Sequence, residues 1–311
     1  MLYKNQICRI LYNINLRIID LKLFPLTSVL IKEQTIMKIE KVWKIYFSPT
    51  RTTKKVVSLL AEEIASSLGA GLDEYDFTLP KMRESFPEIG SDELVIFGMP
   101  TYAGRLPNLM LKYLDTINGG GALAVPVVTF GNRAFDNSLI ELRNILERQG
   151  FHTIAAGAFS CEHSFSTELG AFRPDWEDEE EIKGFARSIA EKLSAKDTQQ
   201  LTASPVEVAG DPEAGYYQPR DRKGNFIDIR KVKPVTGSKC VNCGVCARVC
   251  PMGAIDPTDV TSVPGTCIKC NACVKRCTKG AKFFEDKGYL YHKEELEIMY
   301  GGERAENSLF L

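Results

Sequence analysis

Eight of the ten cysteines in this 311-residue chain fall between positions 240 and 277. They form two runs with the same C-x2-C-x2-C-x3-C spacing: Cys240, Cys243, Cys246 and Cys250, then Cys267, Cys270, Cys273 and Cys277. Each cysteine of the second run lies 27 positions after its counterpart in the first, so the segment is an internal duplication. Clustered cysteines at fixed spacing, in a chain without a convincing secretion signal, indicate metal ligation in a reducing compartment rather than disulfides.

The spacing of each run is typical of iron–sulfur ligation, in which three thiolates of a run bind one cluster and the fourth binds the other. We therefore expect a [4Fe–4S] cluster 1 on Cys240, Cys243, Cys246 and Cys277, and a [4Fe–4S] cluster 2 on Cys250, Cys267, Cys270 and Cys273. Because the chain supplies every ligand, electron transfer is favoured over catalysis at an open iron site. Structural zinc is the alternative; isolated C-x2-C pairs would suit it, but the third and fourth cysteines favour iron–sulfur.

The cysteine-rich module differs in charge from the whole chain. Between positions 236 and 284 the two acids are Asp256 and Asp259, and the seven bases are Lys239, Arg248, Lys269, Lys275, Arg276, Lys279 and Lys282. The module is therefore about +5, whereas the chain is −1 and argues for neither nucleic acid nor a membrane as partner. A solvated basic face would explain the excess. The sharper hypothesis is docking to a redox partner with an acidic surface, or to an acidic part of the same chain.

Residues 37–196 alternate apolar strand-like runs with segments of helical periodicity. Strands are predicted at 41–47, 72–77, 93–102, 122–132 and 151–160, and helices at 52–68, 106–117, 136–150 and 178–195. This alternation predicts an α/β fold with a five-stranded, doubly wound parallel sheet. Residues 197–235 are rich in Pro, Gly and polar residues and are predicted to be a linker, 236–285 the small α+β cysteine-rich domain, and 286–311 a tail with a helix at 292–300.

Three loops that follow predicted strands carry binding chemistry, and ligands of open α/β sheets lie beyond the carboxyl ends of the strands. The first, "SPTRTT", precedes the helix at 52–68; its hydroxyls, Arg51 and the helix N-terminus suit a phosphate, although a single hydroxyl would suffice for a helix cap. The other two offer Tyr102 for stacking and Gly104 and Gly131 for close backbone approach. The predicted cofactor-binding residues are Ser48, Thr50, Arg51, Thr52, Thr53, Pro100, Thr101, Tyr102, Ala103, Gly104, Phe130, Gly131, Asn132 and Arg133.

With these loops, residues 42–195 resemble a flavodoxin, a family with strand order 2-1-3-4-5 and FMN at the switch point of the sheet. "SPTRTT" matches the family phosphate loop [ST]-x-T-x-[NT]-T with Arg51 in place of the usual glycine, and "PTYAGRLP" and "FGNRAFDN" match the two loops that flank the flavin. The cysteine-rich module resembles the two-cluster bacterial ferredoxins, apart from Thr278 where proline is common. The chain after Met37 thus resembles the flavodoxin–ferredoxin fusion proteins of anaerobes, which implies FMN and two [4Fe–4S] clusters. The absence of GxGxxG after the first strand also favours FMN over NAD or FAD.

The expected function is electron transfer by an iron–sulfur flavoprotein, between FMN, the two clusters and redox partner proteins, in the cytoplasm of an anaerobe. One alternative is a reductase whose FMN delivers hydride to a small organic substrate, although no substrate-specific acid or pocket domain is recognisable. Another is a non-enzymatic redox sensor, although no DNA-binding module is visible. The sequence leaves the oligomeric state open, with a homodimer among the alternatives. His163 is a candidate proton donor to reduced flavin or a plain loop histidine, and Cys161 is better explained as a structural thiol than as a nucleophile.

The first 36 residues are apolar and mildly basic, but they lack both an uninterrupted hydrophobic core and an Ala-x-Ala cleavage site. No apolar run in the chain reaches the ~18 residues expected of a membrane-spanning helix. Because Met37 begins a segment that leads directly into the first strand, we expect the natural start there and residues 1–36 to be an extension outside the fold. The alternative is a helix on a membrane surface.

Overall fold

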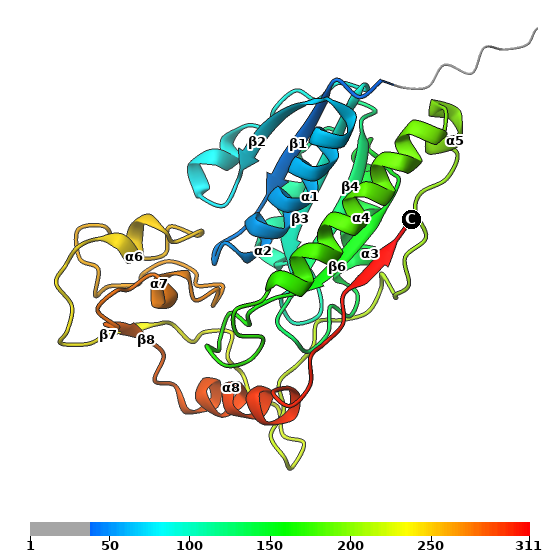
Figure 1. Cartoon of the computed structure of the whole chain (residues 1–311). Helices are drawn as coiled ribbons and strands as arrows, with labels where there is room; N and C mark the ends of the chain where they lie inside the picture. The colour runs from blue at the N-terminus through cyan, green and yellow to red at the C-terminus, as the bar shows by residue number, and fades with distance from the viewer. Residues whose placement is uncertain (1–37) are drawn as a thin grey trace, which may run out of the picture. The chain divides into compact units, whose positions relative to one another are not determined.

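Five parallel strands form the centre of the computed structural model, which describes residues 38–311 (Figure 1). The strands are β1 (Lys41–Tyr46), β2 (Gly71–Asp76), β3 (Glu93–Pro100), β4 (Leu123–Phe130) and β6 (Ala156–Ser160). They lie in the order β2-β1-β3-β4-β6, which confirms the predicted flavodoxin-like order. The predicted N-terminal extension, residues 1–36, lies outside the described residues.

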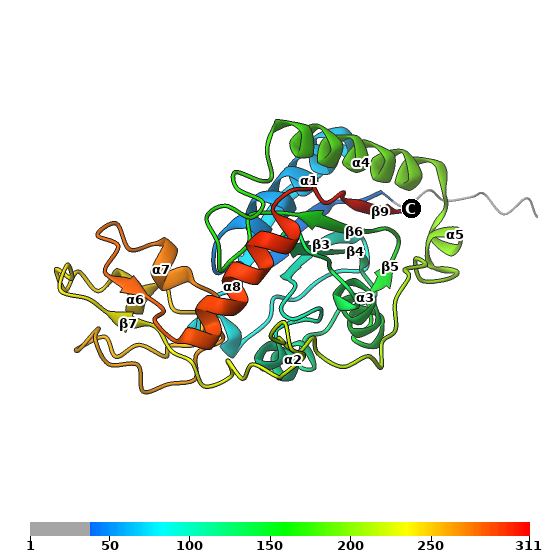
Figure 2. The same cartoon turned by 90° about the horizontal axis from the view of Figure 1, so that it is seen from below.

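The sheet differs from the prediction in two places (Figure 2). The strand predicted at 151–160 is interrupted: β5 (His152–Thr153) and β6 both pair with β4, but the register shifts by one residue between them, as a β-bulge requires. A further strand, β9 (Ser308–Phe310), pairs antiparallel with β6 and is the outermost strand at this edge among the described residues. β9 was not predicted, because a strand of three residues is too short to show a clear alternating pattern.

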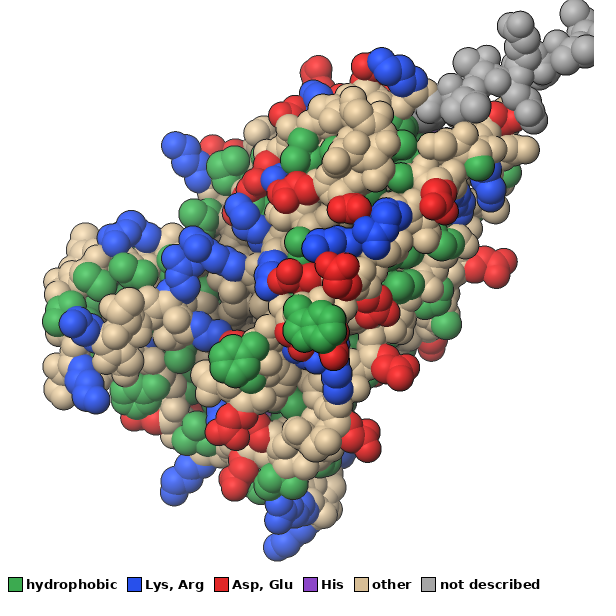
Figure 3. Space-filling view, in the orientation of Figure 1, with side chains coloured by type: hydrophobic (Ala, Val, Ile, Leu, Met, Phe, Trp, Pro, Cys, Tyr) green, Lys and Arg blue, Asp and Glu red, His purple; other side chains and the backbone are tan. Residues whose placement is uncertain are grey.

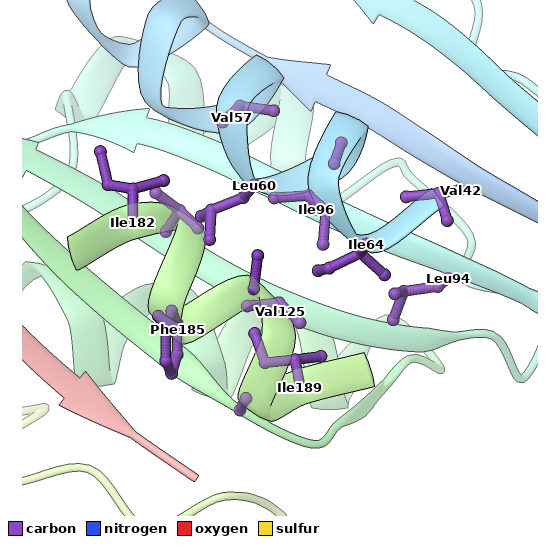
Figure 4. Packing of buried hydrophobic residues seen from close by; sticks show 14 of the residues in the cluster. Val42, Val57, Leu60, Ile64, Leu94, Ile96, Val125, Ile182, Phe185 and Ile189 are labelled. Carbon is purple, nitrogen blue, oxygen red and sulfur yellow. The ribbon is translucent and has the colours of Figure 1, made fainter. Parts of the chain in front are cut away.

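Helices cover both faces of the sheet, and each face has its own core. α1 (Thr52–Leu68) and α4 (Trp176–Ala195) pack on one face, where Leu60 and Ile64 meet Phe185 and Ile189 over the apolar side chains of β1, β3 and β4 (Figure 4). α2 (Asn108–Leu114) and α3 (Ser138–Arg148) cover the other face. All eight residues of β4 are buried, because both of its faces are covered in this way.

The remaining elements are short. The segment predicted as a linker begins with α5 (Thr198–Thr202), and a 3₁₀ helix, η1 (Pro80–Glu84), follows β2. The cysteine-rich module contains α6 (Val245–Arg248), α7 (Ala272–Lys275) and the antiparallel pair β7 (Val235–Thr236) and β8 (Lys282–Phe283). The helix predicted in the tail is α8 (Lys287–Tyr300). None of the helices in residues 38–311 has the length and apolarity that crossing a membrane requires.

A buried ion pair at the start of α4 forms hydrogen bonds to the C-terminal segment. Arg173 donates from Nη2 and Nε to the two carboxylate oxygens of Asp178 at 2.7 and 3.0 Å, and both side chains are buried. Arg173 also donates to the carbonyl of Ala305 at 2.7 Å, and Asn307 donates to Asp178 at 3.2 Å. This network therefore holds residues 305–307, which lead into β9, against the sheet domain.

Asp178→Ala tests the contribution of this network. It leaves Arg173 buried without its carboxylate, so we expect the free energy of unfolding to fall by about 3–5 kcal/mol, as for other broken buried ion pairs. Urea unfolding of the full chain, followed by far-UV circular dichroism, measures the change.

The matched control is Asp115→Ala, which removes the exposed Arg148–Asp115 pair of 2.8 Å. This variant is expected to lose less than ~1 kcal/mol. Equal losses in the two variants would contradict a structural role for the buried network.

Candidate functional site

The eight clustered cysteines line two separate cavities. Cys240, Cys243, Cys246 and Cys277 line one, and Cys250, Cys267, Cys270 and Cys273 line the other. Each cavity thus takes three thiols from one run and the fourth from the other run, which is the exchange predicted from the spacing. α6 and α7 carry the third cysteine of each run, Cys246 and Cys273.

The local geometry repeats between the two halves of the module. The amide of Asn242 donates to Cys240 Sγ and that of Lys269 to Cys267 Sγ, both at 3.4 Å. The amide of Ala254 donates to Cys250 Sγ and that of Ala281 to Cys277 Sγ, both at 3.2 Å. Amide donors that point at sulfur favour the thiolate form that binds metal and tune the potential of a cluster.

The donor set fits a polynuclear cluster. All nine cysteines in the described part of the chain are free of disulfides. Within residues 38–311, no three Cys, His, Asp or Glu side chains converge as a single metal ion would require. Four thiols spread around a cavity, with no other ligand type between them, are instead suited to [4Fe–4S].

The "SPTRTT" loop joins β1 to α1. Arg51 immediately precedes α1. Its φ of 75° is in the left-handed region for which glycine is usual, and its side chain makes no cap hydrogen bond. Ser48 Oγ accepts from the amide of Lys54 at 2.9 Å, and Thr53 Oγ1 bonds Thr129 Oγ1 at 2.7 Å within the core. Thr53 therefore has a structural bond, whereas the half-buried hydroxyls of Thr50 and Thr52 lie 3.5 Å apart at the helix start.

The loop after β3 is held by its own backbone and by neighbouring segments. Tyr102 and Arg105 exchange two backbone hydrogen bonds of 2.8 and 3.1 Å. Gly104 has φ = 77°, and a Cβ at this position would lie 2.5 Å from a carboxylate oxygen of Asp136 in the next loop. The glycine is thus required both by its backbone conformation and by close packing of the two loops.

In the loop after β4, the predicted side chains have partners of their own. Asn132 is buried and its side chain donates to the carbonyls of Tyr300 and Glu303, both at 2.8 Å, so this amide is used in a structural contact. Arg133 pairs with Asp136 at 2.6 Å and lies 4.4 Å from the ring centroid of Tyr217. A Cβ on Gly131 would lie 2.2 Å from the His163 ring, so this position also needs the absence of a side chain.

A cavity of about 540 Å³ lies where these loops meet the cysteine-rich module. Of the predicted residues, Thr101–Gly104, Phe130, Gly131 and Arg133 line it, whereas Pro100, Asn132 and the "SPTRTT" loop do not. The structure therefore brings the second and third predicted loops together at one cavity and leaves the first at a neighbouring strand end. Cys267, a predicted ligand of cluster 2, forms part of the same wall.

Several lining residues were not predicted. The covering segment, residues 216–230, contributes Tyr216, Tyr217 and Phe226, and α8 contributes His292. The amide of Tyr217 donates to the carbonyl of Ala103 at 2.8 Å, and Tyr216 donates to the carbonyl of Leu106 at 2.9 Å. The pair of tyrosines inside a polar stretch was the only signal for this contact in the sequence.

Two histidines in the cavity wall are neutral at pH 7. Burial, followed by the charge of Lys275, lowers the pKa of His163 to about 3, and burial with Arg133 lowers that of His292 to about 4. His163 Nδ1 accepts from the amide of Phe165 at 3.1 Å, so its proton is on Nε2. Burial also raises the pKa of the Cys161 thiol well above its ordinary range, which supports a structural thiol.

The cysteine-rich module contacts the sheet domain through two basic residues. Lys275 forms an ion pair with Glu162 and donates to the carbonyls of His163 and Ser166 at 2.7 and 2.9 Å. Arg83 donates to the carbonyl of Pro251 at 2.6 Å. One basic residue of the module thus docks on an acid of the same chain, while other Lys and Arg side chains are spread over the surface of the module (Figure 3).

The family comparison agrees with this geometry. Residues 239–281 match the model of the 4Fe-4S dicluster domain. These residues form a 4Fe-4S dicluster domain. The chain thus joins a sheet of flavodoxin-like strand order to a dicluster domain, an arrangement consistent with a flavodoxin–ferredoxin fusion. The dicluster domain implies two [4Fe–4S] clusters.

Several solved structures are similar to the sheet domain. They include rubredoxin oxygen:oxidoreductase from the anaerobe Desulfovibrio gigas (19% identity, TM-score 0.37), a flavodoxin from the Archaea (16%, 0.35) and an apo NADH:FMN oxidoreductase (16%, 0.38). The matches cover 51%, 49% and 53% of this chain and 37%, 98% and 96% of those chains. No curated protein gives a significant match to the sequence. The strand order of the sheet itself defines the fold as flavodoxin-like.

Pairs of cysteine substitutions test the exchanged fourth ligand. Cys250→Ala with Cys267→Ala removes two ligands of the same cavity, so the doubly substituted chain is expected to retain about four of about eight irons. Cys240→Ala with Cys250→Ala damages both cavities and is expected to lose nearly all iron. Iron analysis of anaerobically purified protein distinguishes the two pairs. Cys161→Ala is the control and should leave the iron content unchanged.

The result would be reversed if each run held a cluster of its own. In that case Cys240→Ala with Cys250→Ala would spare one cluster, and Cys250→Ala with Cys267→Ala would remove both.

Gly131→Ala tests the loop after β4. The added Cβ would overlap the His163 ring, so we expect the loop or the ring to move and FMN to be held about tenfold more weakly, ~1.4 kcal/mol. Flavin release on dilution, followed by the fluorescence of free FMN, measures this. Gly302→Ala, where a Cβ would meet nothing within 4 Å, is the matched control. Equal release from both variants would contradict a flavin at this loop.

Proposed function

We propose that this protein is an electron carrier that holds FMN in the 540 Å³ cavity and passes electrons between FMN and the two clusters. The observation that carries the proposal is the shared wall: the loops after β3 and β4 line the same cavity as Cys267. Carriers on two sides of one wall can exchange electrons without a mobile intermediary. Bound FMN supplies one- and two-electron chemistry, and each cluster supplies one-electron chemistry.

The residues proposed to hold FMN have separate roles. The start of α1, with Thr50, Thr52 and Arg51, offers backbone amides, hydroxyls and a positive charge for the phosphate. Tyr102 and the backbones of Gly104 and Gly131 would border the flavin ring. The covering segment closes the cavity with the aromatic rings of Tyr216, Tyr217 and Phe226, and α8 adds the ring of His292; these rings would exclude water. His163, neutral with its proton on Nε2, can donate a hydrogen bond inside the cavity.

Partners are proposed to dock on the dicluster domain near cluster 1. Of the predicted ligands of cluster 1, Cys243 is exposed and Cys246 is buried, whereas cluster 2 has two buried ligands, Cys270 and Cys273, and no exposed one, so cluster 1 is the more accessible of the two. The exposed bases Lys239, Arg248 and Lys279 lie on this domain and favour a redox protein with an acidic surface. Because thiolate clusters of this type need reducing conditions, we propose the cytoplasm of an anaerobe as the setting.

Anaerobic purification followed by cofactor analysis and a stepwise reductive titration tests the proposal. We expect about one FMN and about eight irons per chain, the content of one flavin and two [4Fe–4S] clusters. Finding zinc, or no flavin, would overturn it. Transfer to acidic redox proteins should slow as ionic strength rises.

A screen with NAD(P)H and small organic acceptors separates carrier from reductase. Rapid multiple turnover of an organic acceptor, without any protein partner, would replace the electron carrier with the reductase alternative.

A further inference from the structure

Lys282 is a buried base of the cysteine-rich module. It lies on β8, only 2% of its surface is exposed, and its ammonium group has no hydrogen-bond partner among residues 38–311. It also lines the cavity formed by Cys240, Cys243, Cys246 and Cys277. A buried ammonium without a counter-charge is costly, so the site requires a negative group to balance it.

The internal duplication provides a direct comparison between the two cavities. Lys282 corresponds, at the same offset of 27 positions, to Ile255, which lines the cavity of cluster 2. The other two bases that line the cluster 1 cavity, Arg276 and Lys279, correspond to Val249 and Met252. No charged side chain in the described residues lines the cluster 2 cavity. Two otherwise repeated ligand sets therefore differ in their local charge.

This difference has a predictable effect on the clusters. A four-thiolate cluster gains negative charge when it is reduced, and a nearby buried cation stabilises the more negative state. Lys282 is the buried member of the three bases, so solvent screens it least. The exposure of Cys243 acts in the same direction, because water also stabilises the more negative state.

We propose that Lys282 raises the reduction potential of cluster 1 above that of cluster 2, so that the first electron shared by the two clusters resides on cluster 1. The inference rests on the proposed pair of clusters and on FMN beside Cys267. Cluster 2 is next to the flavin cavity through Cys267, and cluster 1 is the exposed site. Electrons that enter from the cavity thus move to the cluster from which a partner can take them. Each step moves one electron from the reduced donor to the oxidised acceptor, with no bond made or broken.

The test compares Lys282→Met with Ile255→Met in the full, cofactor-loaded chain. A reductive titration followed by electron paramagnetic resonance reports the two clusters. In the unaltered protein we expect two separate steps. Lys282→Met should lower the reduction potential of the higher step by at least about 59 mV. For a one-electron couple, this shift changes the distribution of the electron between the two clusters at least tenfold. Ile255→Met keeps the charge unchanged and should leave both steps in place.

The reciprocal substitution, Ile255→Lys, should raise the lower step and bring the two potentials together. Iron is measured in every sample. If Lys282→Met does not hold eight irons, Lys282→Gln, which also removes the charge, is read in its place. Unmoved steps in loaded Lys282→Met or Lys282→Gln, or an equal shift of both steps, would overturn the inference. Absence of eight irons from the unaltered protein would instead overturn the proposed pair of clusters.

Discussion

Burial of β3 and β4 between two layers of helices is the constraint on which the arrangement of the site depends. Every residue of β4 is buried, and six of the eight residues of β3 are buried. Strands with both faces covered have no solvent-facing side chains, so polar and flexible residues can follow only where the strands end. Because β1, β3 and β4 are parallel neighbours, their loops emerge at one edge of the sheet. The dicluster domain contacts the sheet domain at this edge, through Lys275 and the loop after β6.

Local patterns in the sequence were sufficient to predict much of the fold and the grouping of the cysteines. α1 has the predicted bounds, because its apolar periodicity begins directly after the polar loop and ends at Gly69, a glycine in the left-handed conformation. The exchange of Cys250 and Cys277 followed from spacing alone, since a short run can place only three thiols around one cavity. The strand order followed from the alternation of apolar runs and helices together with the family resemblance.

Contacts between distant residues could not be predicted in this way. The buried amide of Asn132 binds the carbonyls of Tyr300 and Glu303, and nothing in "FGNRAFDN" indicates that its partner lies 168 or more positions away. Likewise, Tyr217 and His292 stack with ring centroids 6.0 Å apart, although they belong to segments without a shared pattern. The left-handed backbone of Arg51 was equally hard to predict, because arginine does not favour this conformation and the surrounding structure must hold it.

The short strand β9 has a consequence for the choice of binding surface. An exposed sheet edge offers unpaired amide and carbonyl groups to any extended chain, and proteins commonly protect such edges by making the last strand very short. β9 spans three residues, Ser308–Phe310, and covers the edge of β6. An edge strand of three residues offers few unpaired backbone groups with which an extended peptide could pair on this side of the sheet. Edge-to-edge association with another chain is thereby disfavoured at this edge.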